Sequence, residues 1–159
     1  MGAFNTLPVL LRRMDFLNNL FTTIFTTHPW HVPTTHFPIA LTGVALLFLL
    51  LALWRRNETL ERAAFFNMAV AVVSIVLAGL TGYRDYIIRF EGETPEAGLK
   101  IFLTISLFVL TFVITIARWR QPDLLWKPST MILYVLGFTA SFILAATLGL
   151  IGGIILYGY

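Results

Sequence analysis

The sequence predicts an all-α integral membrane protein, a four-helix bundle preceded by an N-terminal amphipathic helix that lies in the membrane interface. The first observation is composition: hydrophobic residues make up 58% and charged residues 12% of the 159 residues. A soluble domain usually has about 25% charged residues. The second is that the apolar residues gather in long segments, each close to the ~20 residues needed to cross ~30 Å of hydrocarbon. Lipid is therefore the expected solvent for most of the chain.

Several function classes are disfavoured by the composition. The chain has no cysteine, which excludes disulfides, iron–sulfur clusters and thiol catalysis. The net charge of +3 is small and dispersed, so nucleic acid is not an expected partner. Neither a nucleophile–base pair nor a carboxylate pair inside a cavity can be recognised, so we do not expect an enzyme.

Residues 1–27 are predicted to form the amphipathic interfacial helix. Charged and amide residues interrupt the apolar ones, and no small-residue cleavage site follows, so a secretory signal is excluded. The alternative is a disordered tail. Steps of three or four place one apolar stripe along the segment: Leu7, Leu10, Met14, Leu17, Phe21, Ile24 and His28.

Residues 28–159 are predicted to form the four-transmembrane-helix domain. It begins with a proline-broken corner over residues 28–38, because Pro29, Pro33 and Pro38 each lack an N–H and fix φ. The expected spans are residues 37–54, 63–83, 99–117 and 130–157.

The connections between spans carry slightly more Lys and Arg on one side of the membrane than on the other. Residues 55–62 and 118–129 hold six such residues, against five on the opposite side. The positive-inside tendency then places these two connections in the cytoplasm. We therefore predict a multi-pass protein of the bacterial inner membrane with both termini on the outer, periplasmic side.

Small residues at intervals of four predict where helices pack, because helices in lipid associate through close backbone contact. We expect the second and fourth spans to meet through these stripes. A binding slot for a flat cofactor or a lipid tail is the alternative. The stripes are Ser74, Ala78 and Gly82 in the second span and Gly137, Ser141, Ala145, Gly149 and Gly153 in the fourth.

The three histidines are the first candidates for chemistry, since all of them lie between His28 and His36, with His31 between. Alternating helix directions bring Asp85 to the same bilayer face. Histidines with a carboxylate suit zinc, copper or iron, and histidine also holds haem or the magnesium of a chlorophyll. We consider His28, His31 and His36 as cofactor ligands, and His28, His36 and Asp85 as metal ligands. Alternatively, the histidines anchor the interface and Asp85 marks the water boundary.

Three segments carry a resemblance to a known family: HPWHVPTTHFPIAL at residues 28–41, TGYRDY at residues 81–86 and GLIGGIILYGY at residues 149–159. The chain resembles a bacterial family of predicted four-helix membrane proteins, a domain of unknown function marked by an HP turn followed by HFPIAL. The resemblance implies that His28 and His36 match the motif histidines and Asp85 the motif aspartate. Where many relatives carry a further histidine, near the start of the third span, this chain has Lys100 or its neighbours.

The resemblance further implies partners among redox proteins, since some relatives are joined to cytochrome-like or Rieske-like domains. Our leading hypothesis is a non-catalytic subunit of a bacterial respiratory or photosynthetic electron-transport complex, embedded in lipid beside other subunits. Haem b, a (bacterio)chlorophyll or a transition metal are the candidate cofactors. The alternatives are an independent haem-b electron-transfer protein and a small transporter or channel.

Overall fold

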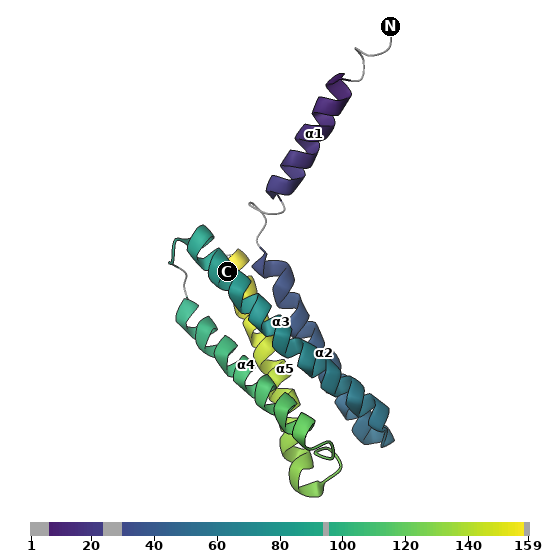
Figure 1. Ribbon diagram of the computed structural model, residues 1–159. Coiled ribbons are helices and arrows are strands. Elements are labelled where there is room, and N and C mark those ends of the chain that lie inside the picture. The colour runs from purple at the N-terminus through teal and green to yellow at the C-terminus, as the bar shows by residue number, and fades with distance from the viewer. Residues whose placement is uncertain (1–6, 24–29, 94–95, 158–159) are drawn as a thin grey trace.

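The computed structural model describes residues 7–23, 30–93 and 96–157, and every regular element in these ranges is a helix. Four of the helices are long and apolar enough to cross a membrane, which confirms the predicted fold class (Figure 1). The elements are α1 (Leu7–Thr22), α2 (His31–Arg55), α3 (Glu58–Phe90), α4 (Ala97–Arg120) and α5 (Pro128–Tyr157).

The four long helices form an up-down-up-down bundle in which sequence neighbours pack side by side and α5 returns to α2. α3 and α5 lie on a diagonal: among the described residues, no Cα of α3 is within 8 Å of a Cα of α5. The prediction that these two helices meet through their small-residue stripes is therefore wrong.

The small residues instead pack against the helices on either side. A Cβ on Gly137 would stand 2.7 Å from Ile114 of α4, and one on Gly149 would stand 2.7 Å from Ile39 of α2. Gly82 of α3 faces α2 in the same way. Ser74, Ala78, Ser141 and Ala145 are buried, whereas a Cβ on Gly153 would meet nothing within 4 Å.

The helices extend beyond the predicted spans, most visibly at the start of α2. The expected corner over residues 28–38 is helical from His31 onward, with Pro33 and Pro38 inside the helix. Pro33 lies in the first turn, where its missing N–H would have no helical partner in any case. Inside a membrane protein, neighbouring helices and hydroxyl side chains also make an internal proline tolerable.

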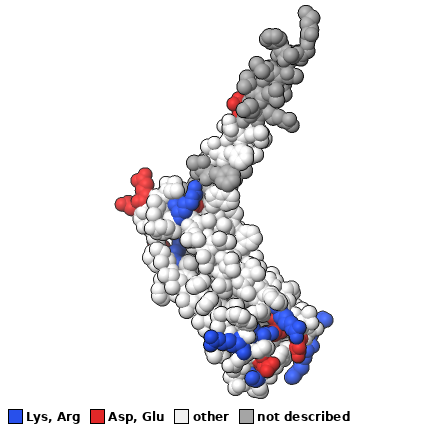
Figure 2. Space-filling model, viewed as in Figure 1, with Lys and Arg blue, Asp and Glu red and all other residues white. Residues whose placement is uncertain are grey.

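Large apolar side chains point away from the bundle over its whole middle: Leu47, Val73 and Phe102 are each more than half exposed. Such a surface would drive aggregation in water, but it matches lipid chains. Figure 2 shows charged side chains gathered toward the two ends of the bundle, with a broad uncharged band between them. The exposed apolar side chains and the uncharged band therefore both identify a membrane protein.

α1 extends away from the bundle and packs on none of the four long helices within the described ranges (Figure 1). Its described side chains, including Phe16, Leu17 and Phe21, are exposed. That it lies in the membrane interface stays a prediction.

Candidate functional site

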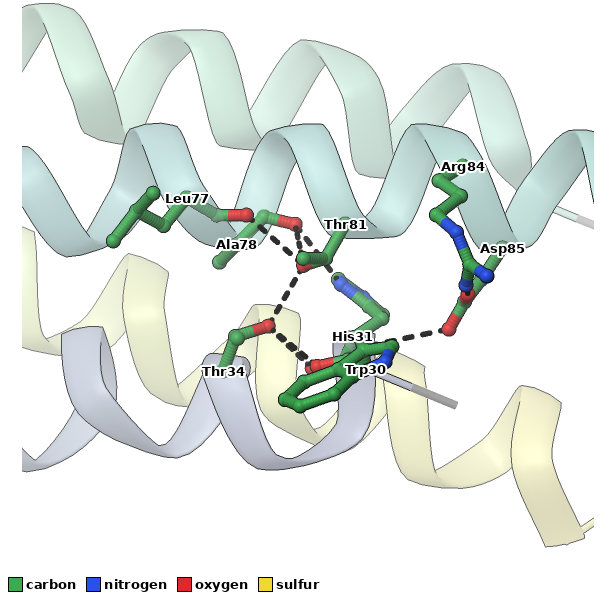
Figure 3. A network of polar contacts seen from close by, with 8 residues as sticks. All are labelled: Trp30, His31, Thr34, Leu77, Ala78, Thr81, Arg84 and Asp85. Carbon is green, nitrogen blue, oxygen red and sulfur yellow. Dashed lines mark hydrogen bonds and ion pairs between the residues drawn. The ribbon is translucent and has the colours of Figure 1, made fainter. Parts of the chain in front are cut away.

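A network of polar groups joins the start of α2 to the last turns of α3 (Figure 3). The first N–H groups of a helix have no partner within the helix. Here the His31 N–H donates to Asp85 Oδ2 at 3.2 Å, so a carboxylate from α3 caps α2. The positive end of the α2 dipole favours that charge. Asp85 is 4% exposed and also pairs with Arg84, at 3.1 Å.

The imidazole of His31 is held against α3. Its Nδ1 lies 3.0 Å from the carbonyl oxygen of Ala78. Because a carbonyl only accepts, this contact assigns the proton to Nδ1 and leaves Nε2 as the basic nitrogen. Beside the ring, the hydroxyls of Thr34 and Thr81 lie 2.8 Å apart. These contacts fix both the tautomer and the orientation of the ring.

Gly82 makes room for this ring. A Cβ at this position would stand 2.7 Å from Cε1 and 2.8 Å from Nδ1 of His31. Real Cβ atoms do not approach a ring so closely, so either the ring or the helix would have to move. The glycine therefore allows the α2–α3 contact on which the network depends.

Next to this network, a cavity of about 470 Å³ separates α3 from α5. His31, Asp85 and Lys100 lie along its polar end, and its floor is the buried cluster of Ile75, Leu107 and Ala145. The lining is contributed by all four long helices. This volume falls within the usual range of ligand sites, about 300–1,000 Å³.

The cavity reaches the outer surface between α3 and α4, where its lining residues Ile101 and Ile105 are more than half exposed. A second pocket of about 250 Å³ shares Ile75, Gly79, Thr104 and Ile105 with the first. It adds Val76, Leu80 and Phe108, and Leu80 is 64% exposed on the outer surface of the bundle. In a membrane that surface meets lipid chains, so the cavity has a lateral opening toward the bilayer.

The histidines predicted to act together are not all found at this cavity. His31 lines it with Asp85, whereas His36 is exposed on α2 and its Nδ1 lies 2.8 Å from the carbonyl oxygen of Val32. His28 lies outside the described residues. Within the described ranges, no group of three His, Asp or Glu side chains could hold a metal ion. Metal binding by His28, His36 and Asp85 stays a prediction.

A second polar cluster, at the opposite end of the bundle, escaped the sequence analysis. Arg118 of α4 donates from Nε to Glu61 Oε1 and from Nη2 to Glu61 Oε2, the latter at 2.5 Å. Glu61 is 1% exposed, and the Tyr134 hydroxyl donates to it at 3.3 Å. Phe65 lies against the guanidinium, 5.3 Å from Cζ to the ring centroid. This cluster joins α3, α4 and α5.

The bundle and its cavity define a class: a four-helix integral membrane protein with a lateral, largely apolar cavity that ends in ionisable groups. The chain belongs to the family described as "Predicted membrane protein (DUF2231)", whose model matches residues 27–154. This confirms the resemblance to a membrane-protein family of unknown function. No curated protein and no solved structure matches the chain.

Proposed function

We propose that this protein is a non-catalytic membrane protein that binds a lipid-soluble, amphipathic molecule in the cavity between α3 and α5. The observation that carries the proposal is a cavity of about 470 Å³ with His31, Asp85 and Lys100 at one end and an opening toward lipid at its side. A molecule with one polar end and one apolar end matches this distribution.

The chemistry of the walls supports a ligand with a substantial apolar part. Thr35 and Thr104 line the cavity, but their hydroxyls donate to the carbonyls of Val32 and Lys100 in their own helices. Such internally bonded hydroxyls offer little to water. An apolar guest therefore displaces poorly held water from the walls, while its polar end finds partners beside α2.

Replacing Gly79 by Leu is expected to displace the ligand from the cavity. Gly79 lines both the cavity and its opening, and a Cβ there would meet nothing within 4 Å, so Leu fills ligand space without a clash. Losing about 1.4 kcal/mol of binding free energy weakens the affinity for the ligand roughly tenfold and lowers its occupancy accordingly. The measurement is native mass spectrometry of the full chain released from nanodiscs made with cell-derived lipids.

The matched control is Gly98→Leu on α4, where an added Cβ also meets nothing and the position does not line the cavity. Wild type and Gly98→Leu should keep the same bound mass. Equal occupancy of Gly98→Leu and Gly79→Leu would contradict the proposal.

We place this binding protein in the bacterial inner membrane, as a subunit of a respiratory or photosynthetic electron-transport complex, with both termini periplasmic. Its membrane character and the resemblance to partners of redox proteins support this setting. Purification from native membranes in mild detergent should bring redox proteins with it. Isolation as a lone, colourless monomer would contradict membership of such a complex, but it would not bear on ligand binding in the cavity.

A second candidate function is haem or chlorophyll binding through His31. Histidines that ligate a metal nearly always donate their other N–H to a carboxylate or a backbone carbonyl. The bond between His31 Nδ1 and Ala78 O has this form, and no described residue is hydrogen-bonded to Nε2. Nε2 would then hold the iron or magnesium from one side.

This second candidate predicts a Soret or chlorophyll absorption band in the purified protein. The band should disappear in His31→Ala and persist in His36→Ala, since His36 lies outside the cavity lining. If the wild-type protein is colourless, pigment binding is excluded. The proposal of a lipid-soluble ligand is then tested by the native mass spectrometry described above.

A further inference from the structure

The inner faces of α3 and α4 each carry an ionisable residue near both ends. Residues spaced alternately three and four positions apart share one helix face. Such spacing connects Glu61 with Asp85 on α3, and Lys100 with Arg118 on α4. At one end of the bundle, Glu61 and Arg118 form a buried ion pair. At the other end, Asp85 and Lys100 both line the cavity; Asp85 is paired with Arg84, and no ion pair joins it to Lys100.

Lys100 is thus a surplus cation on the cavity wall. Its side chain reaches across to α5, where a Cβ on Gly152 would stand 3.9 Å from Nζ. No residue in the described ranges supplies Nζ with a hydrogen-bond acceptor or a carboxylate. The C-terminal end of α5 favours a cation, but it offers only a fraction of a charge.

An ammonium group between membrane-spanning helices is costly unless something pairs with it, so such residues mark places where ligands or ions are held. The ligand that lowers this cost most is an anion. One cation matches one negative charge, which a carboxylate carries. His31 lines the same cavity, but its Nε2 carries no proton and only accepts, so Lys100 is the donor that pairs with the carboxylate.

We expect the rest of the ligand to leave between α3 and α4, where the second pocket adjoins the cavity. This opening is lined by Gly79, Thr104 and Phe108 among others and holds about 250 Å³. A single alkyl chain passing here would reach the exposed side of Leu80, and so the bilayer. One alkyl chain is enough to connect a headgroup at Lys100 with the bilayer along this path.

We propose that the ligand is a single-chain amphiphile with a carboxylate headgroup, which pairs with Lys100 while its tail runs out between α3 and α4. The proposal rests on the proposed function and specifies its ligand class. The carboxylate takes the place at this end that Glu61 occupies beside Arg118 at the other. The role of Lys100 is therefore to form an ion pair with the ligand.

The test uses the full chain in phosphatidylcholine nanodiscs with a diazirine-labelled fatty acid, at a pH where the acid is ionised, and the matched labelled fatty alcohol. Lys100→Met keeps the apolar stem and removes the charge. We expect it to weaken binding of the acid about 10- to 100-fold, the loss of one charge-assisted hydrogen bond. Lys100→Arg should retain binding, and so should Lys127→Met, which removes an exposed charge at the opposite end. Crosslinks should map to Ile105 and Phe108.

Binding of the alcohol should be weaker than binding of the acid and unchanged by Lys100→Met, which also reports that this variant is folded. If acid and alcohol bind wild type equally, the carboxylate assignment is wrong, while the cavity function stands as long as Gly79→Leu weakens binding of both. If Gly79→Leu changes neither, both proposals fail. Displacement of the label by phosphatidylglycerol at lower concentration than by free fatty acid would overturn the single-chain assignment.

Discussion

Replacing Glu61 by Gln is expected to destabilise the bundle by about 3–5 kcal/mol, because it leaves the guanidinium of Arg118 buried without a counter-charge. Both oxygens of Glu61 accept from Arg118, and the carboxylate is 1% exposed. Gln keeps the size of the side chain, so the loss reports the charge and not a cavity. The measurement is the free energy of reversible unfolding in mixed micelles.

The matched control lies one turn away. Glu58 and Arg62 form an ion pair at 3.8 Å with side chains 72% and 67% exposed, so Glu58→Gln should change stability by no more than about 0.5 kcal/mol. The double variant Glu61→Leu/Arg118→Met should recover most of the loss, because apolar residues replace a buried pair at little cost. If Glu61→Gln costs no more than Glu58→Gln, the buried pair is not formed.

Gly82→Ala should have the second largest effect, about 1–3 kcal/mol, by driving the imidazole of His31 off its carbonyl partner. The added Cβ would stand 2.7 Å from a ring that is bonded to Ala78. The ring cannot turn away without leaving its own Nδ1–H unpaired, whereas the carbonyl of Ala78 still accepts from the Thr81 hydroxyl. Unfolding in mixed micelles gives the cost, and the His31 imidazole resonances report the lost contact.

Gly137→Ala provides the comparison, because its Cβ would meet Ile114 at the same 2.7 Å. The atom met there is Cδ1, the far end of a flexible chain, so Gly137→Ala should cost less. The double variant His31→Ala/Gly82→Ala should be no less stable than His31→Ala alone, since the clash is then absent. Strictly additive losses would contradict the role given to Gly82.

The fold was predictable because it follows from length and hydrophobicity alone: each apolar segment must span lipid as a helix. The pairing of α3 with α5 was mispredicted because small residues were followed in steps of exactly four. The buried side of α3 follows alternating steps of three and four, as helices packed at a small angle require. This stripe is Glu61, Ala64, Met68, Ala71, Ile75, Ala78, Gly82 and Asp85.

The same stripe shows which residues of the two polar clusters could have been predicted from the sequence. Followed from Ala78 in steps of three and four, it reaches Asp85 in one direction and Glu61 in the other, so both carboxylates could have been placed inside the bundle. Lys100 and Arg118 occupy the corresponding face of α4, with buried Leu107 between them. The cavity was not predictable, because it depends on how far apart α3 and α5 are held, a distance set by the side chains of α2 and α4.

Separation of α3 from α5 by a cavity is the central claim, and the natural absence of cysteine allows a direct test by disulfide formation. A disulfide requires Cα atoms within about 7 Å. Thr34→Cys/Thr81→Cys, at positions whose hydroxyls lie 2.8 Å apart, should crosslink readily on mild oxidation in nanodiscs. Ala78→Cys/Ala145→Cys, across the diagonal of the bundle, should stay reduced. Crosslinking of the second pair as fast as the first would mean that α3 and α5 touch through their small residues, and the cavity would not exist.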